Sequence, residues 1–194
     1  MRRINIAIFI SDVGFGHIVR EKEIAIQLFR VFKKISITFF LKDNINILKN
    51  KFTNYTNKKN IFYEKNFNNI SLFTNKNGSL KKKRTITFLK KWCNRKDKSL
   101  NLYKKKLKKF DIFISDLVPE IFYYSKLNKK ISFGICHYTW DWLFEEIMKN
   151  KSKETKLMNY YNTLAHRIYL PPFTPYKNLN SLKNYQEVNF IYKM

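Results

Sequence analysis

The sequence predicts an α/β fold with a doubly wound, mostly parallel sheet. Short runs that are apolar on both faces alternate with longer stretches that carry apolar residues at helical spacing. Strands of this kind are typical of parallel sheets that helices cover on both sides, with a right-handed crossover at each step. The chain has 194 residues, 44% of them apolar, which is enough for a core in a single domain over residues 1–194.

The first half of the chain begins with residues 4–10, which are apolar almost throughout and predict a buried strand. A helix is expected to begin near His17. Its apolar face would consist of Ile24, Leu28, Val31 and Phe32. The other elements expected here are a strand over 35–41, a helix over 44–51, a strand over 60–63, an Asn-rich loop over 66–78, and one helix or a helix pair over 79–109.

The second half continues the alternation. Pro119 suits the first turn of a helix and marks the start of one. The elements expected here are strands over 111–115, 131–136 and 167–170, helices over 120–127, 140–150 and 155–166, and a last strand over 188–192.

The net charge of +25, from 39 Lys and Arg against 14 Asp and Glu, would suit nucleic acid or an anionic membrane. Lys, Asn and Ile are abundant while Gly and Pro number 4 each, so A/T-rich codons also explain the charge. The basic runs at 81–84 and 104–109 would point all round a helix, as on a solvated surface. We therefore do not expect nucleic acid as a partner, whereas an anionic partner stays open.

The cellular location is predicted from cysteines and from targeting signals. Cys93 and Cys136 cannot form a disulfide framework and indicate reduced thiols in a cytosol. No window approaches the roughly 20 apolar residues that span a bilayer, and the apolar start has no cleavage site after it. We expect a cytoplasmic protein, with a peripheral contact at the inner face of the membrane left open. No spacing of residues predicts a metal site, and we expect no cofactor.

Ligands of doubly wound sheets bind at the carboxyl ends of the strands. That rule selects three turns, namely the turn after the first strand, the turn at Asp116 and the turn at 137–139. The glycines of the first turn match neither the dinucleotide fingerprint, because Val19 replaces its third glycine, nor a P-loop.

The turn after the first strand leads directly into a helix. Its residues Gly14, Phe15 and Gly16 let the backbone approach an anionic ligand at the helix N-terminus. The helix dipole disfavours a protonated imidazole, so His17 would be neutral and able to accept a proton. Arg20, three residues on, could meet a phosphate or carboxylate. The alternative is that His17 only caps the helix and Arg20 is solvated.

Residues 6–20 resemble the opening of GT-B glycosyltransferases that start with Gly-His-Gly-x-Gly-His-x-x-Arg. Residues 113–119 and 138–146, which contain Ser-Asp-x-x-Pro and Trp-Asp-Trp-x-x-Glu-Glu, are similar to later motifs of the same proteins. Residues 170–173 and 188–192 resemble two of their later strands. These proteins are relatives of the N-acetylglucosaminyltransferase that completes the peptidoglycan lipid precursor, and of the N-terminal region of plant L-arabinokinase.

The resemblance implies the Rossmann-like N-terminal half of a GT-B fold, which binds the acceptor. Such an enzyme transfers a sugar from a nucleotide-sugar donor to an acceptor, here an envelope or polysaccharide acceptor that is a sugar or is lipid-linked. In this family the donor binds mainly to a C-terminal domain, and the chain ends where that domain should begin. The resemblance therefore also implies a partner chain that carries the second domain.

Carried over residue by residue, the resemblance makes His17 the first candidate for the base and Asp116 the second. Asp116 could instead cap the following helix. Trp140 could stack on a sugar ring or fill the core. The other candidates for substrate binding are Gly14, Phe15, Gly16, Arg20, His137, Thr139, Asp141 and Glu145.

Some of these candidates have a structural explanation as well. Asp141 and Glu145, one helical turn apart, could bind a sugar or only favour the helix dipole. His137 stands where the family commonly has Asn, and a single His at a strand end is more often structural.

Two other functions stay open. One is a non-catalytic module, truncated or split, that binds an anionic ligand or a partner domain. The other is a binder of nucleic acid or anionic membranes that depends on charge alone.

Overall fold

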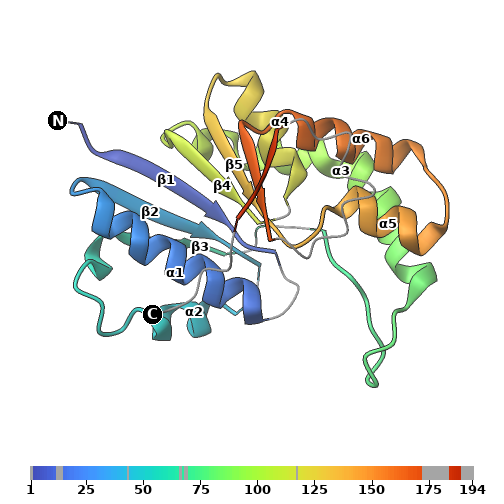
Figure 1. Ribbon diagram of the computed structural model, residues 1–194, viewed down its shortest axis with the longest axis horizontal. Helices are drawn as coiled ribbons and strands as arrows, with labels where there is room; N and C mark the ends of the chain where they lie inside the picture. The colour runs from blue at the N-terminus through green and yellow to red at the C-terminus, as the bar shows by residue number, and fades with distance from the viewer. Residues whose placement is uncertain are drawn as a thin grey trace.

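The computed structural model describes residues 2–11, 15–42, 44–65, 67, 70–116, 118–171 and 184–188, and only the backbone of Phe15 and of residues 96–99. Seven strands in this part of the chain form one parallel sheet in the order β3-β2-β1-β4-β5-β6-β7 (Figure 1). The strands are β1 (Ile4–Phe9), β2 (Ile35–Phe40), β3 (Ile61–Glu64), β4 (Ile112–Ser115), β5 (Ile131–Ile135), β6 (Arg167–Leu170) and β7 (Tyr185–Glu187).

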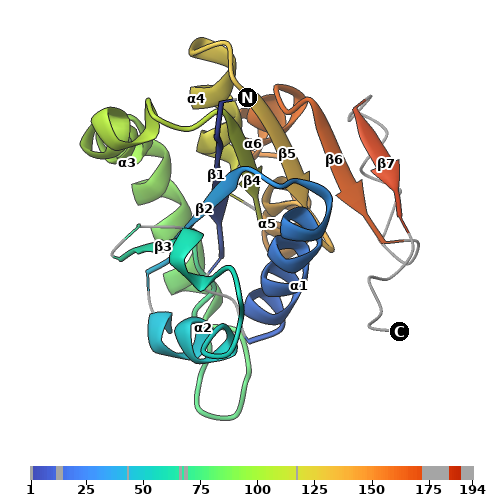
Figure 2. The same cartoon turned by 90° about the vertical axis from the view of Figure 1, so that its left-hand side faces the viewer.

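Helices cover both faces of the sheet, as the doubly wound prediction requires (Figure 2). Helices α1 and α2 pack on one face, and α3 to α6 pack on the other. The helices are α1 (Phe15–Val31), α2 (Ile45–Lys51), α3 (Lys82–Leu107), α4 (Pro119–Leu127), α5 (Trp140–Met148) and α6 (Lys153–Thr163), with a short 3₁₀ turn, η1 (Lys58–Asn60).

Strand β1 is buried on both faces, which explains why its sequence is apolar almost throughout. Ile6 and Ile8 pack into the core under α1 and α2. Ala7 and Phe9, the residues between and after them, pack into the core under α3 and α4. Successive side chains of a strand point to opposite faces, so both faces must be apolar when helices cover both.

The order of the strands reverses between β1 and β4. The chain moves outward from β1 through β2 to β3, returns across the sheet, and places β4 on the other side of β1. The register pairs Phe9 with Ser115 at the carboxyl ends of the two strands. In a doubly wound sheet this reversal leaves a crevice outside those ends, where ligands bind.

One predicted strand lies mostly outside the described residues. Among the described residues the last strand is β7, Tyr185–Glu187, which ends just before the predicted strand over 188–192; Val188 lies outside β7, and 189–192 lie outside the described residues. Strand β7 lies at the edge of the described sheet, where one side of the strand is exposed. Polar residues such as Gln186 are tolerated there, so no apolar run in the sequence indicates this strand.

The predicted apolar face of the first helix was only half right. Val31 is 72% exposed and Phe32 lies beyond the end of α1, so neither belongs to the buried face. That face contains Ile18, Ile24 and Ala25. The predicted helix or helix pair after the loop is the single long helix α3.

Gly134 in β5 is predicted to tolerate no side chain. A Cβ atom there would lie 3.0 Å from Cγ1 of Ile168 and 3.1 Å from Cζ of Phe122. We expect Gly134→Ala to lower the free energy of unfolding by about 1–3 kcal/mol, because the crowded core must shift. The matched control is Gly16→Ala in α1, where a Cβ atom would meet nothing within 4 Å and where alanine should stabilise the helix by about 0.5–1 kcal/mol. Denaturant unfolding measures both, and equal stabilities would contradict this packing.

Candidate functional site

The carboxyl ends of β1 and β4 bring three sequence-distant side chains together. Ser11 follows β1, Asp116 follows β4, and His17 lies in the first turn of α1. The backbone N–H of Asp116 donates to the carbonyl of Phe9 over 2.9 Å, which continues the strand pairing up to the site. The backbone N–H of Val118 donates to the hydroxyl of Ser115, which closes the turn after β4.

His17 and Asp116 form a close hydrogen-bonded pair. Nδ1 of His17 lies 2.5 Å from Oδ2 of Asp116. The carboxylate can only accept, so the imidazole carries its proton on Nδ1 and keeps Nε2 as the nitrogen that can take up another proton. The hydroxyl of Ser11 donates to the same Oδ2 over 3.2 Å. The side chain of Asp116 is completely buried, whereas that of His17 keeps 11% of its surface exposed.

Asp116 therefore does not cap the next helix, which was the alternative from sequence. The N-cap of α4 is Val118, and no side chain caps it. Both candidate bases lie in one cluster, with His17 on the exposed side and Asp116 behind it. An imidazole placed in this way can accept a proton from a ligand, while a carboxylate behind it can hold its orientation.

The side chain of Arg20 is mostly buried, so the alternative that it is solvated is wrong, while its contact with a phosphate or carboxylate of a ligand stays a prediction. Its Nη2 forms an ion pair with Oδ1 of Asp116 over 2.5 Å and donates to the carbonyl of Ile135 over 3.1 Å. Its Nε donates to Oε1 of Glu21 over 3.0 Å. Only 14% of the Arg20 side chain is exposed. The guanidinium is thus shared by two carboxylates before any ligand arrives.

Glu21 is the member of the cluster that sequence reasoning missed. Its side chain is completely buried, and Oε2 has no hydrogen-bond partner among the described residues. A signal was present, because Glu21 stands three residues after Ile18 and four before Ala25, on the buried face of α1. A carboxylate on an apolar helix face needs a partner inside the protein.

The two buried carboxylates have opposite pKa shifts. Burial raises the pKa of Glu21 to about 8, against the opposing effect of Arg20. Burial also acts to raise the pKa of Asp116, but Arg20 and His17 outweigh it and lower that pKa below its ordinary value. Asp116 therefore keeps the negative charge near neutral pH, and Glu21 keeps a proton.

The candidates at the end of β5 lie beside this cluster. His137 is exposed, and burial of part of its ring together with the charge of Arg20 lowers its pKa. Thr139 is 2% exposed and is the N-cap residue of α5, with no hydrogen bond from its side chain to that helix.

Gly16 is exposed at the start of α1. Gly14 and the side chain of Phe15 lie outside the described residues.

The tryptophan motif of α5 serves the core. Trp140 is 1% exposed and packs on Phe144, which favours the core alternative over sugar stacking. The carboxylate of Asp141 is 5% exposed and accepts hydrogen bonds from the side-chain amides of Asn159 and Asn162 in α6. Asp141 therefore joins two helices. Glu145 lies on the same helix and is partly exposed.

A pocket of about 400 Å³ opens next to the cluster. Its described walls come from α1 and from the carboxyl ends of β5, β6 and β7. Most of them are apolar; Arg20 and Glu23 are charged, and His137, Cys136 and Tyr169 are titratable. The apolar part of the lining consists of Val19, Ile135, Pro171, Val188 and the ring of Tyr169.

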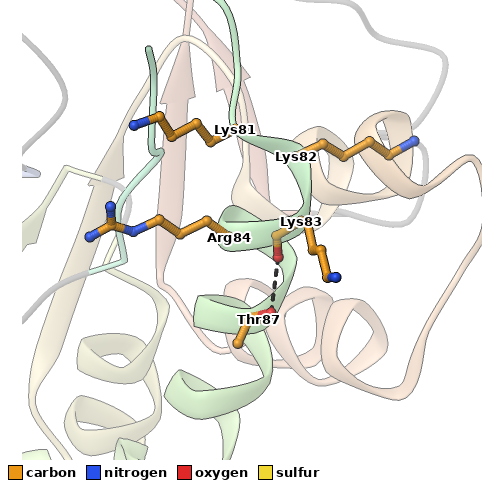
Figure 3. Close-up of a pocket in the computed structure, with 5 residues that line it drawn as sticks. All are labelled: Lys81, Lys82, Lys83, Arg84 and Thr87. Carbon is orange, nitrogen blue, oxygen red and sulfur yellow. Dashed lines mark hydrogen bonds between the residues drawn. The ribbon is translucent and has the colours of Figure 1, made fainter.

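The basic run at the start of α3 has a different character. Lys81, Lys82, Lys83 and Arg84 surround a shallow pocket, but their charged groups diverge in Figure 3 and do not converge on a common point. The guanidinium of Arg84 lies over the ring of Phe73, 4.5 Å from its centroid. Thr87 donates its hydroxyl to the carbonyl of Lys83 over 2.9 Å. This arrangement agrees with the solvated surface expected from sequence.

The described residues contain neither a helix that could span a membrane nor a cluster that could bind a metal ion. None of the described helices is long and apolar enough to cross a bilayer. No group of three or more His, Cys, Asp or Glu residues in the described ranges could hold a metal ion.

Glu21 predicts how the stability of the fold changes with pH. The folded protein holds a proton on Glu21 up to about pH 8, whereas the unfolded chain releases it near the ordinary Glu value of about 4.3. The free energy of unfolding should therefore fall as the pH rises from about 5 to 8. Glu21→Gln cannot ionise and should flatten this part of the curve, as measured by denaturant unfolding at several pH values. Glu146→Gln, which removes an exposed carboxylate, should leave the slope unchanged, and an equally steep curve for Glu21→Gln would contradict the assignment.

Comparisons with known proteins support the fold. No family model matches the sequence, and no curated protein does. The structure is similar to UGT2 of Phytolacca americana, with a TM-score of 0.57 and 11% identity over 98% of this chain and 53% of that one. A UDP-glucosyltransferase of Polygonum tinctorium gives a TM-score of 0.56 and 10% identity over 100% and 54% of the two chains.

A third solved structure agrees with these two. UGT73P12 of Glycyrrhiza uralensis gives a TM-score of 0.57 and 7% identity over 97% of this chain and 48% of that one. The chain thus spans about half the length of these structures. At such low identity the likeness concerns the fold alone. The chain has the Rossmann-like α/β fold of GT-B glycosyltransferase domains.

Proposed function

We propose that this chain is the acceptor-binding half of a GT-B glycosyltransferase, with His17 as the general base. The observation that carries the proposal is the hydrogen bond of 2.5 Å between Nδ1 of His17 and Oδ2 of Asp116 at the ligand edge of the sheet. A buried carboxylate that fixes Nδ1–H leaves Nε2 ready to take a proton from an acceptor hydroxyl.

The reaction is a displacement at the anomeric carbon of a nucleotide-sugar. The acceptor oxygen gives its proton to Nε2 of His17 and forms a bond to the anomeric carbon. The bond between that carbon and the phosphate oxygen breaks, and the nucleoside diphosphate leaves with the bonding electrons. Asp116 stabilises the imidazolium that forms, because its carboxylate stays ionised beside it.

The donor is expected to bind mainly to a second domain. The chain aligns with about half of UGT2 from Phytolacca americana, a structure solved with UDP-2-fluoroglucose and pterostilbene. We therefore propose that a second Rossmann-like domain, on a partner chain or in the same protein, supplies most of the nucleotide-sugar site.

A second candidate function is a binding module without catalysis. The alignment with only about half of each neighbour supports it, because half of a GT-B enzyme can bind an acceptor without a donor. It predicts acceptor binding but no sugar transfer in the presence of any second domain.

Variants of the histidine–aspartate pair separate the two functions. We expect His17→Ala and Asp116→Asn each to lower sugar transfer about 10²–10⁴-fold, the usual contribution of a positioned base. The double variant should be no worse than the slower single variant, because the two residues act as a unit. The assay measures transfer from UDP-glucose and other nucleotide-sugars to a panel of alcohols, with the chain alone and with the product of the adjacent reading frame.

The control for this assay is Glu146→Gln, an exposed residue of α5 that should retain full activity. A loss of only a few-fold in His17→Ala would reject the base assignment. Acceptor binding by calorimetry without transfer in any mixture would favour the binding module.

The acceptor is proposed to be an envelope or polysaccharide component, and a lipid-linked one would lie at the inner face of the membrane. The net charge of +25 supports this location, because a basic surface is attracted to anionic lipid. We expect the protein to sediment with vesicles that contain phosphatidylglycerol at 0.1 M salt and to be released at 0.5 M salt. Vesicles of phosphatidylcholine alone should not bind it, and equal binding to both would contradict an electrostatic contact.

A further inference from the structure

We propose that Glu21 is a positioning residue that holds the His17–Asp116 pair in its working geometry by acting through Arg20. The effect on turnover rests on the proposed function. The effect on the geometry of His17 concerns the protein without substrate and can be tested independently of any reaction.

The location of Glu21 calls for a role. It occupies the buried face of α1 between Ile18 and Ala25, where an apolar residue would pack without the desolvation of a carboxyl group. Replacement of a whole buried ion pair by apolar residues is often neutral or stabilising, whereas removal of one partner leaves the other charge without compensation. Arg20 also pairs with Asp116, so its charge does not by itself require an acidic residue at position 21.

A continuous series of contacts links Glu21 to the imidazole. Oε1 of Glu21 accepts from Nε of Arg20 over 3.0 Å. Nη2 of the same guanidinium pairs with Oδ1 of Asp116 over 2.5 Å, and Oδ2 of Asp116 accepts from Nδ1 of His17 over 2.5 Å. Arg20 has a long side chain with several rotatable bonds, so an anchor at Nε restricts where Nη2 can lie.

The contact between Arg20 and Oδ1 of Asp116 controls the orientation of Oδ2, which accepts from His17. The ion pair between Nη2 of Arg20 and Oδ1 disfavours rotation of the Asp116 carboxylate away from His17. Without that ion pair, the bond to Nδ1 weakens and the imidazole can carry its proton on Nε2 instead. A ring with the proton on Nε2 has its unprotonated nitrogen at Nδ1, which faces Asp116 and not the acceptor hydroxyl.

The division of charge fits this role. Three titratable or charged groups surround Glu21. Arg20 contacts it directly, whereas Asp116 and Cys136, at the end of β5, interact with it electrostatically. Burial raises the pKa of Glu21 to about 8, so near neutral pH its carboxyl group is mostly neutral. A neutral Oε1 accepts from Nε without competing with Asp116 for the positive charge of Arg20.

The test compares Glu21→Gln with Glu21→Leu, which have similar size. Glutamine keeps an oxygen for Nε of Arg20, whereas leucine removes it. ¹⁵N NMR of histidine-labelled protein reports which ring nitrogen of His17 carries the proton, and His17→Gln assigns its signals among the three histidines. We expect the Nδ1–H form to persist in Glu21→Gln and to give way to a mixture of both forms in Glu21→Leu. A second variant, Glu21→Asp, retracts the carboxyl group by one methylene and should also give a mixture.

Stability and turnover complete the test. Glu21→Leu leaves Nε of Arg20 without its acceptor and should unfold at a lower denaturant concentration. The tautomer is therefore measured where denaturant unfolding shows the variant to be fully folded, so that a lost tautomer cannot be ascribed to a damaged fold. Transfer by Glu21→Leu should fall at least about tenfold in kcat with little change in KM, as for a misplaced reacting group. Glu146→Leu should change none of these quantities.

The outcomes separate this proposal from the proposed function. The proposal is overturned if His17 keeps the Nδ1–H form in both Glu21→Leu and Glu21→Asp. If the tautomer changes as expected but the unmodified protein transfers no sugar with any second domain, the positioning role stands and the transferase function fails.

Discussion

The carboxylate of Asp116 is completely buried at the junction of β1 and β4, and the candidate site is organised around it. One of its oxygens meets Arg20, and the other meets His17 and Ser11. A buried carboxylate persists only where several donors compensate for lost water. This requirement brings together residues from the ends of two strands and from the first helix, so the site's geometry follows from satisfying one charge.

The sheet places the carboxylate of Asp116 at an edge where a ligand can reach the residues that contact it. Both faces of β1 are covered, so its side chains are committed to packing and only its carboxyl end is free for chemistry. The reversal of strand order between β1 and β4 puts the two carboxyl ends side by side. His17 lies on the exposed side of the pair and Asp116 behind it. In the proposed function this layering suits proton transfer, because the imidazole would meet the ligand while the carboxylate behind it stays away from water.

The electrostatics of the interior differ from those of the surface. The chain carries a net charge of +25, yet the site combines one guanidinium with the buried carboxylate of Asp116 and the buried, mostly neutral carboxyl group of Glu21. The positive charge of Arg20 is compensated inside this cluster, so the basic composition of the chain does not indicate the net charge of the site. The lysines at the start of α3 diverge into solvent (Figure 3). A basic surface and an acidic buried cluster therefore follow from separate requirements.

The sequence by itself determined the fold class, nearly every described strand and helix, and that His17 and Asp116 lie at the same edge of the sheet. Apolar runs and helical spacing are local properties, and strand ends in a doubly wound sheet mark the ligand edge whatever the packing details. It could not determine that Arg20 turns inward, that Glu21 is buried beside it, or that Asp141 bridges two helices. Those arrangements depend on which side chains meet across elements that are distant in sequence, and only the tertiary structure decides where a buried charge finds its partners.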